Sequence, residues 1–486
     1  MLHLLLIALV VTLFADDATG EALRLPGATD ADATVFMLAA MSAIAFSALA
    51  WGRVCAGRLR RSGRWVWVAR AERASSGARL GAVLVHAFGV LALGWLDAVR
   101  AVLGDWVLLD EAVALAPALG VFFASWLAFG PIDRLLWEGS LVRTLDDGAP
   151  LHPPRGVWRY ALDQARHQGA IVLVPLTIIW SWSEGVAKAF ERAGILVNTD
   201  AEAIALSAAQ FVGVIVAFVV TPPLMMRIWR TVPLGSGELR DRLEALCRRH
   251  RVRCRDIRVW MTDGMMLNGA VMGIFPPVRY ILLTDALLES LPSDQVEAVA
   301  AHEIAHIRRR HLPWLLAAML VAIWLGGAIV LVPFDLVSAA LGLELLGTPA
   351  DYVAQGAGAF LAIAAAVLAF GIVSRAYERQ ADAFAVQSMS GLDTPAEANA
   401  RITPEAAASM AGSLDAVARL NAIPAQRFFW RHGSISGRRK RILDLEGAPV
   451  RFTDADRASR RIKYVTAAGL VAMASVEAMM AWWSMW

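Results

Sequence analysis

Charged residues are scarce in this chain. Only 18% of its 486 residues are Asp, Glu, Lys or Arg, whereas soluble domains contain about a quarter. Hydrophobic residues make up 57%, and the mean hydropathy is +0.52. This balance excludes an ordinary soluble domain and indicates a chain that lies largely in a lipid bilayer.

The net charge is also small, and cysteines are few. The formal net charge is only +3, so electrostatics give no reason to expect a nucleic-acid partner. The three cysteines, Cys55, Cys247 and Cys254, are odd in number and lack the spacing of a metal site. They indicate reduced thiols rather than a disulfide framework.

Long apolar runs, in contrast, recur along the chain. Most are close to the ~20 residues that a membrane-spanning helix needs, and the 18 tryptophans suit a membrane interface. We therefore expect a mainly α, polytopic membrane protein with about eight or nine transmembrane helices. The first run is short and is expected to be an anchor, with a cleaved signal peptide as the alternative. The runs cover about 2–15, 34–52, 80–97, 112–131, 169–183, 203–226, 312–333, 353–373 and 465–484.

Residues 227–311 have a different character and predict a small soluble α+β domain. Residues 238–250 form a charged amphipathic pattern, residues 256–262 alternate as a strand does, and Tyr280–Thr284 is a second apolar strand. We expect an N-terminal membrane domain of about six spans, a domain interrupted by two spans, and a C-terminal span. Their bounds are 1–226, 227–463 (interrupted at about 312–333 and 353–373) and 464–486.

Arginine placement predicts the topology. The loops between the expected spans alternate between Arg-rich and acid-rich, and the positive-inside rule places the Arg-rich loops in the cytoplasm. All three cysteines fall in Arg-rich loops, which agrees with a reducing compartment. We expect an integral protein of the bacterial inner membrane with its polar domain on the cytoplasmic side. The Arg-rich loops are 53–79, 132–168, 227–311 and 374–463, and the acid-rich loops are 16–33, 98–111 and 334–352.

One motif with chemical meaning, H-E-x-x-H, runs from His302 to His306. On a helix these two histidines project from the same face, so their ring nitrogens can bind one zinc ion. Glu303 lies beside the first of them, where a carboxylate can take a proton from water. The motif arises by chance in roughly one such chain in a hundred, often on a surface helix. Here apolar residues flank it, which predicts a buried helix whose His and Glu side chains need partners.

Zinc needs a third protein ligand, and Glu378 is the candidate. It follows the expected span at 353–373, on the same predicted side of the membrane as the H-E-x-x-H helix. Asp382 lies one helical turn further on and can accept a hydrogen bond from a ligating imidazole. The alternative is a solvated helix end whose charges mark the membrane boundary, and spacing alone leaves both interpretations open.

Together these motifs resemble the HtpX and CAAX prenyl protease family of integral membrane zinc endopeptidases. The H-E-x-x-H helix is followed by two expected spans and then by S-R-x-x-E-x-x-A-D at 374–382. His311 fits a histidine that usually follows the metal helix in this family. The likeness covers about 235–445, and the first 226 residues carry no motif that matches.

Two further segments share this resemblance. Residues 268–273 resemble the family's N-A-x-x-x-G edge strand, which lies along the substrate, with Gly269 in place of the usual Ala. Residues 432–438 resemble its H-P-S-x-x-x-R, with Gly433 in place of Pro.

The resemblance implies a zincin-like metalloprotease domain at the cytoplasmic face. His302, His306 and Glu378 would bind one zinc ion per chain, Asp382 would support the ligands, and Glu303 would act as general base. The expected partners are a peptide or protein substrate, membrane-embedded ones included, and the lipid bilayer.

Further site residues follow from the same resemblance. His432 and Arg438 would lie near the scissile carbonyl, with Arg439 as the substitute if the register differs. The alternative for them is a basic loop that faces anionic lipid. The substrate-binding residues of the edge strand would be Asn268, Gly269, Ala270 and Gly273.

The sequence therefore favours a zinc-dependent membrane endopeptidase over two other classes of protein. One is a transporter or channel in which the motif is incidental, but few ionisable residues fall within the expected spans. The other is a catalytically silent membrane scaffold, which would not require Glu303.

Overall fold

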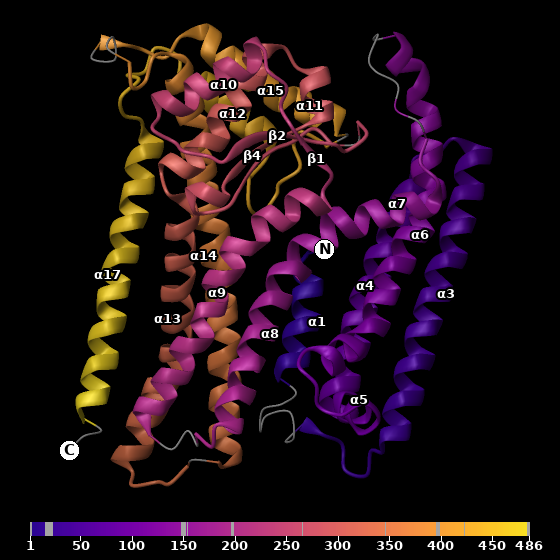
Figure 1. Ribbon diagram of the computed structural model, residues 1–486, viewed down its shortest axis with the longest axis vertical. Helices are drawn as coiled ribbons and strands as arrows, with labels where there is room; N and C mark the ends of the chain where they lie inside the picture. The colour runs from indigo at the N-terminus through magenta and orange to yellow at the C-terminus, as the bar shows by residue number, and fades with distance from the viewer. Residues whose placement is uncertain are drawn as a thin grey trace. The chain divides into compact units, whose positions relative to one another are not determined.

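The computed structural model describes residues 2–14, 23–146, 152, 154–195, 199–264, 266–345, 347–394, 399–421 and 423–483. The chain divides into two compact units, Met1–Arg230 and Thr231–Trp486 (Figure 1). In the described residues, the regular secondary structure of the first unit is all helical, and the second unit combines helices with one small sheet.

Long apolar helices make up the first unit. Helices α3, α4 and α6 pack against one another around a core that includes Met37, Val83 and Phe122. Two of the helices begin with capping boxes, α3 at Thr29 and α9 at Thr199, which pair the first free backbone N–H groups. The helices are α1 (Leu2–Phe14), α3 (Asp30–Ser62), α4 (Val66–Leu93), α5 (Trp95–Leu103), α6 (Leu109–Asp146), α7 (Val157–Gln164), η1 (Ala165–Gly169), α8 (Ala170–Arg192) and α9 (Asp200–Ile228).

Eight helices within the described residues are long and apolar enough to cross a membrane. The prediction of a mainly α, polytopic membrane protein with a small α+β portion is therefore confirmed. The first apolar run is the exception, because α1 has only 13 residues, fewer than the ~20 that a bilayer requires.

The sheet of the second unit has four strands in the order β1-β2-β4-β3. β2 and β4 are parallel, and the other two pairs are antiparallel. β3 therefore lies at an edge, while β4 is buried along its whole length. The strands are β1 (Thr231–Pro233), β2 (Asp256–Trp260), β3 (Gly269–Met272) and β4 (Tyr280–Thr284), and the strands expected at 256–262 and 280–284 are present.

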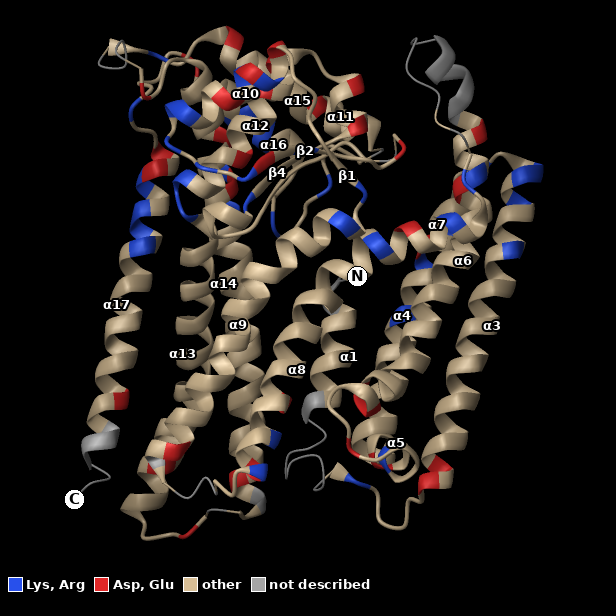
Figure 2. Cartoon of the chain, in the orientation of Figure 1, with Lys and Arg blue, Asp and Glu red and all other residues tan. Residues whose placement is uncertain are grey.

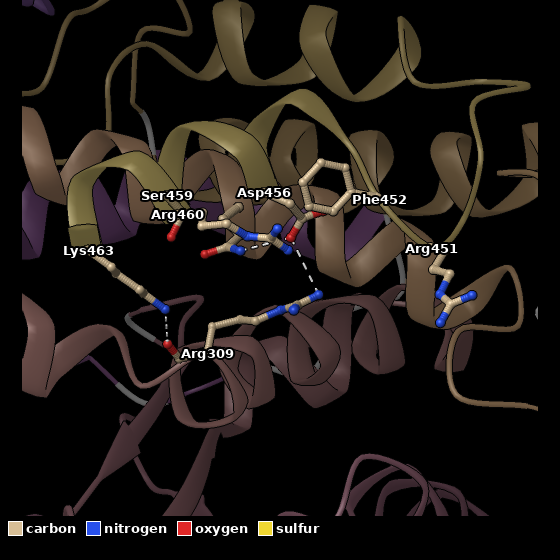
Figure 3. Close-up of a pocket in the computed structure, with 8 residues that line it drawn as sticks. Arg309, Arg451, Phe452, Asp456, Ser459, Arg460 and Lys463 are labelled. Atoms are coloured by element: carbon tan, nitrogen blue, oxygen red, sulfur yellow. Dashed lines mark hydrogen bonds and ion pairs between the residues drawn. The ribbon is translucent and has the colours of Figure 1, made fainter. Parts of the chain in front are cut away.

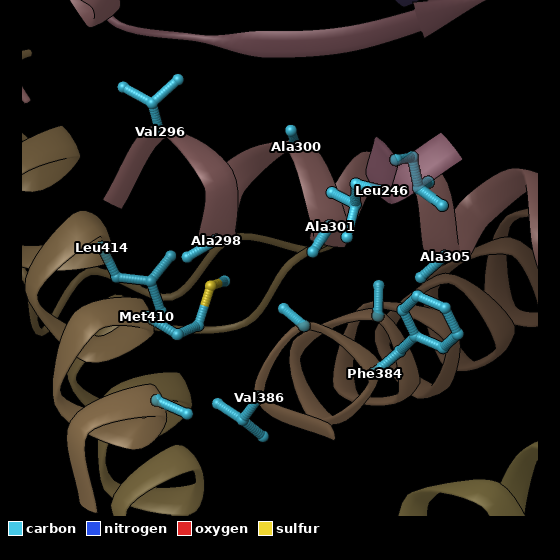
Figure 4. Close-up of a cluster of buried hydrophobic side chains, with 14 of the residues drawn as sticks. Leu246, Val296, Ala298, Ala300, Ala301, Ala305, Phe384, Val386, Met410 and Leu414 are labelled. Carbon is cyan, nitrogen blue, oxygen red and sulfur yellow. The ribbon is translucent and has the colours of Figure 1, made fainter. Parts of the chain in front are cut away.

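Helix α12 (Ser293–Arg308) lies at the centre of this unit and carries the H-E-x-x-H motif. Its buried alanines, Ala298, Ala301 and Ala305 among them, let α14 and α15 (Pro404–Leu420) pack closely around it (Figure 4). The expectation from the apolar flanks, a buried helix, is therefore confirmed. Ser293 is of a residue type that commonly caps helices, and the sequence alone would predict it as the N-cap. That prediction is wrong, since Pro292 occupies the N-cap position and Ser293 is the first helical residue.

Helix α14 (Pro349–Met389) connects the membrane portion to the soluble portion without a break. Its 41 residues extend for about 60 Å. The expected span at 353–373 occupies its first part, and Glu378 and Asp382 follow, about three and two turns before its end. The remaining helices are α10 (Glu238–Arg249), α11 (Asp285–Ser290), η2 (Pro276–Val278), α13 (His311–Ala340), α16 (Ile435–Leu443) and α17 (Asp454–Trp483).

Candidate active site

Helices α12 and α14 bring His302, His306 and Glu378 together. The Nε2 atoms of the two histidines are 3.3 Å apart, and they lie 3.7 and 3.8 Å from the two carboxylate oxygens of Glu378. The Glu378 and His302 side chains are buried, and that of His306 is 28% exposed. These three residues form a group that could hold a metal ion.

The donor atoms suit zinc. Zinc binds imidazole nitrogen and carboxylate oxygen at about 2.0–2.2 Å, so two tetrahedral ligand atoms lie about 3.3 Å apart. The measured separations of 3.3 to 3.8 Å are close to this value. Three protein ligands also leave a fourth position open, as in catalytic rather than structural zinc sites.

Asp382 and Arg438 support this group from behind. Asp382 Oδ1 lies 3.0 Å from His302 Nδ1, the ring nitrogen that faces away from Glu378. Arg438 donates from Nε and Nη2 to the two oxygens of Asp382 at 2.9 and 2.6 Å, and its Nη2 lies 3.5 Å from Glu378. Arg438 is buried, so its guanidinium offsets the charge of two carboxylates that would otherwise be costly to bury.

A second chain of contacts supports His306. His311 Nδ1 lies 3.0 Å from His306 Nδ1, and His311 Nε2 lies 3.0 Å from Oε1 of Gln380. Gln380 in turn donates to Asp456 at 2.8 Å, and the His311 ring stacks on Tyr377. Such partners orient a ligating imidazole. The roles of Gln380 and Asp456 were not predicted from the sequence.

Burial and charge set the protonation of the motif. Burial and the neighbouring His302 lower the pKa of His306 to about 4, which keeps its ring neutral and able to bind a metal. Burial alone would lower the pKa of His302, but contact with Asp382 raises it above its usual value. Burial raises the pKa of Glu303, which makes its carboxylate a stronger base.

The edge strand β3 lies against the same face of α12. A Cβ added at Gly269 would lie 2.8 Å from Val299 Cγ1 and 3.3 Å from Glu303 Cγ, so glycine permits the close approach. Gly273 has a φ of +98°, and its Cβ would meet the Val278 carbonyl oxygen at 2.3 Å. The expected substrate strand is thus beside the expected general base.

The other residues of that segment are accessible or paired within the sheet. Asn268 pairs with Thr284 through its backbone N–H and C=O, and its side chain is exposed. Ala270 is half-buried and lies opposite Leu282 of β4.

Gly269→Ala is expected to lower the unfolding temperature. The new methyl group would press on Val299, and such overpacking costs about 1–3 kcal/mol. Thermal unfolding in detergent measures the effect. In a Val299→Ala background the opposing methyl group is gone, so Gly269→Ala should lower the unfolding temperature much less. An equal decrease of the unfolding temperature in the two backgrounds would show that β3 does not approach α12 as described.

His432 also contacts one of the three candidate metal ligands. Its Nδ1 lies 3.1 Å from Glu378 Oε1, and its side chain is 42% exposed. Arg439, the substitute considered for Arg438, instead pairs with Asp415 at 3.1 Å and is half-exposed. The structure therefore brings His432 and Arg438 to the candidate site and leaves Arg439 outside it.

A second constellation of catalytic residue types lies elsewhere in the unit. His250 contacts Ser388 at 2.6 Å through Nε2 and Asp393 at 2.9 Å through Nδ1, in the order of a serine-hydrolase triad. His250 and Ser388 are both fully buried, and the His250 ring packs on Phe384. No substrate could reach this hydroxyl, so the contacts join α10 to α14 structurally.

Part of the chain resembles known proteins. Residues 233–445 match the model of Peptidase family M48. A protease HtpX homolog of Aeropyrum pernix is 30% identical over 178 residues, which cover 35% of this chain and 53% of the relative. CAAX prenyl protease 1 of Saccharomyces cerevisiae is 30% identical over 107 residues, which cover 21% of this chain and 23% of the relative.

The chain thus spans about half the length of the first curated relative and less of the second. Among solved structures, Ste24p of S. mikatae covers 85% of this chain and 98% of its own, with 15% identity and a TM-score of 0.43. The family match covers the residues that carry the sequence motifs, among them His302, His306 and Glu378. Residues 233–445 therefore match peptidase family M48, and the resemblance to the HtpX and CAAX prenyl protease family is confirmed.

Proposed function

We propose that this protein is a zinc-dependent membrane endopeptidase whose ligands are His302, His306 and Glu378. One observation carries the proposal: the three ligand atoms converge beside Glu303, and an edge strand lies against the same helix face. A metal, a base and a surface that can bind extended peptide are the parts that peptide hydrolysis needs.

Each residue of the group has a separate task. When bound, zinc supplies a Lewis acid that polarises the scissile carbonyl and acidifies water. Glu303 accepts a proton from the attacking water and returns it to the leaving amine. Asp382 and Arg438 hold His302 in place through the contacts described above. His432, half-exposed beside Glu378, donates a hydrogen bond to the oxyanion that develops.

The substrate is proposed to be an extended peptide segment that adds a strand to β3. An edge strand offers unpaired backbone groups, so pairing gives affinity with little demand on side chains. Asn268, Gly269, Ala270 and Gly273 would line this contact. The expected substrates are peptides or proteins, membrane-embedded ones included, because α14 carries Glu378 on the same helix as a membrane span.

Metal analysis beside a cleavage assay tests the function. Purified protein in detergent is expected to contain about one zinc per chain and to cleave an unfolded peptide. Removal of the metal with a chelator should abolish cleavage, and added zinc should restore it. A transporter with an incidental motif would show no metal-dependent cleavage, and a silent scaffold would bind zinc without cleaving.

We further propose that the metal site faces the cytoplasm of a bacterial cell. The Arg-rich loops support this orientation. We also propose three domains, 1–226, 227–463 and 464–486, of which the second contains the metal site and two of the Arg-rich loops.

Cysteine labelling in intact cells tests this orientation. A membrane-impermeant maleimide is expected to label Glu344→Cys from outside, since the acid-rich loop that contains Glu344 would face away from the cytoplasm. Arg427→Cys should react only after lysis. Both positions are exposed, and the parent protein, whose Cys55 and Cys247 are buried, provides the control. The reverse pattern would place the site in the other compartment.

A further inference from the structure

A cavity of about 340 Å³ lies in the second unit between the end of α12, α14 and the first turns of α17 (Figure 3). None of the three candidate metal ligands lines it. Its size falls at the lower end of the range for small-ligand pockets, about 300–1,000 Å³. The lining residues are Arg309, Gln380, Arg451, Phe452, Asp456, Ser459, Arg460 and Lys463.

The lining is strongly cationic. Four of its side chains are Arg or Lys, and only Asp456 is acidic. Arg309 pairs with Asp456 at 3.4 Å, but no carboxylate among the described residues forms an ion pair with Arg451, Arg460 or Lys463. Like charges held this close repel one another, so the cavity favours an anion.

A buried hydroxyl also faces the cavity. Ser459 is 1% exposed, and its Oγ has no hydrogen-bond partner within the described parts of the chain. In Figure 3 this oxygen lies on the side of α17 from which Lys463 also projects, toward Arg309. A buried polar group without a partner is unfavourable, and a ligand oxygen in the cavity would satisfy it.

The acidic residue of the cavity is already engaged. Asp456 accepts hydrogen bonds from Gln380 and Gln387, and from the backbone N–H and hydroxyl of Thr453. These contacts fix the wall of the cavity, and the single carboxylate charge of Asp456 is outnumbered by the four Arg and Lys side chains. Lys463 is likewise held, because it donates to the Arg309 carbonyl oxygen at 2.6 Å.

The position of the cavity along α17 fits a membrane interface. Four of its residues, Asp456, Ser459, Arg460 and Lys463, occupy the charged first turns of this candidate span (Figure 2). The apolar portion of the helix begins directly afterwards, at Tyr464. Charged turns at the end of a span lie at the depth of lipid headgroups.

We propose that this cavity binds a phosphate group. Phosphate presents several anionic oxygens at once, which matches guanidinium groups from Arg309, Arg451 and Arg460, the Lys463 ammonium and the Ser459 hydroxyl. The phosphate comes either from the headgroup of an anionic phospholipid or from a soluble phosphate, and the two sources are distinguishable by experiment.

Binding is measured on the full chain in maltoside detergent, which contains no phosphate. Native mass spectrometry after addition of phosphatidylglycerol reports the lipid, and equilibrium dialysis with labelled inorganic phosphate reports the soluble ion. We expect one bound molecule per chain from at least one source. Retention of lipid alone would identify a headgroup site, and retention of phosphate alone a site for a soluble ligand.

Matched variants locate the site. Arg451→Gln with Arg460→Gln should weaken binding at least about tenfold, because two charged donors are lost. Arg457→Gln with Arg461→Gln removes the same charge from exposed positions of α17 that do not line the cavity, and should change affinity by less than about twofold. Ser459→Ala, which deletes only an unpartnered hydroxyl, should weaken binding about threefold.

Three results would overturn the proposal. In the first, neither source binds at one molecule per chain. The two double variants could lose affinity equally, which would show general attraction of anions to a basic helix end. Full binding by Ser459→Ala would show that the ligand does not occupy this cavity.

Discussion

Replacing Glu303 with Gln is expected to lower peptide cleavage by at least about a hundredfold, since general-base catalysis supplies 10²–10⁴ in rate. The zinc content should stay near one per chain, because Glu303 is not among the three converging ligand residues. Gln keeps the volume and one hydrogen-bonding oxygen, so the packing against Gly269 should survive. Cleavage assays and metal analysis on the same preparation separate the two effects.

Glu297→Gln provides the matched control. Glu297 lies on the same helix, outside the metal-binding group, so its replacement should change neither cleavage nor zinc content. Loss of zinc together with activity in Glu303→Gln would make Glu303 structural. Cleavage at the original rate would mean that another site performs the hydrolysis.

The H-E-x-x-H helix could be predicted from the sequence because its geometry is local. The four-residue spacing of His302 and His306 places both rings on one helix face regardless of the rest of the chain. The strand at Tyr280–Thr284 was predictable for a similar reason, since a short apolar run bounded by polar residues suits a buried strand.

The roles of Glu378 and Asp382 could not be predicted from their spacing in the sequence alone. Helix α13 and the apolar first part of α14 separate them from the motif along the chain, and only the family resemblance favoured them over a solvated helix end. The structure shows why their distance along the chain is no obstacle. α14 packs against α12, which brings the carboxylates to the two imidazoles.

Contacts that depend on the packing of distant elements could not be predicted. Asp456 lies at the start of α17, beyond the part of the chain that resembles the family, and meets Gln380 only because α17 packs on α14. The close approach of Gly269 to Glu303 is likewise a product of how the sheet sits on α12.

Replacing Glu378 with Gln should remove the metal itself. Its two carboxylate oxygens lie 3.7 and 3.8 Å from the ring nitrogens of His302 and His306, so it supplies the only anionic ligand of the group. The amide is a weaker, neutral ligand, and it leaves Arg438 with less negative charge nearby. Loss of a partner that only supports a ligand already weakens metal binding 10–100-fold. We therefore expect a loss of at least about a hundredfold for Glu378→Gln.

Asp382→Asn is the informative comparison, because Asp382 contacts His302 from the side away from the metal position. It should weaken zinc binding by about 10–100-fold, less than Glu378→Gln does. Competition with a chelator of known zinc affinity measures both variants without relying on activity. A larger loss of zinc affinity in Glu378→Gln than in Asp382→Asn would distinguish the metal ligand from the residue that orients a ligand. If Asp382→Asn proves as damaging as Glu378→Gln, or more so, Glu378 is not the third ligand and the proposed metal site is wrong.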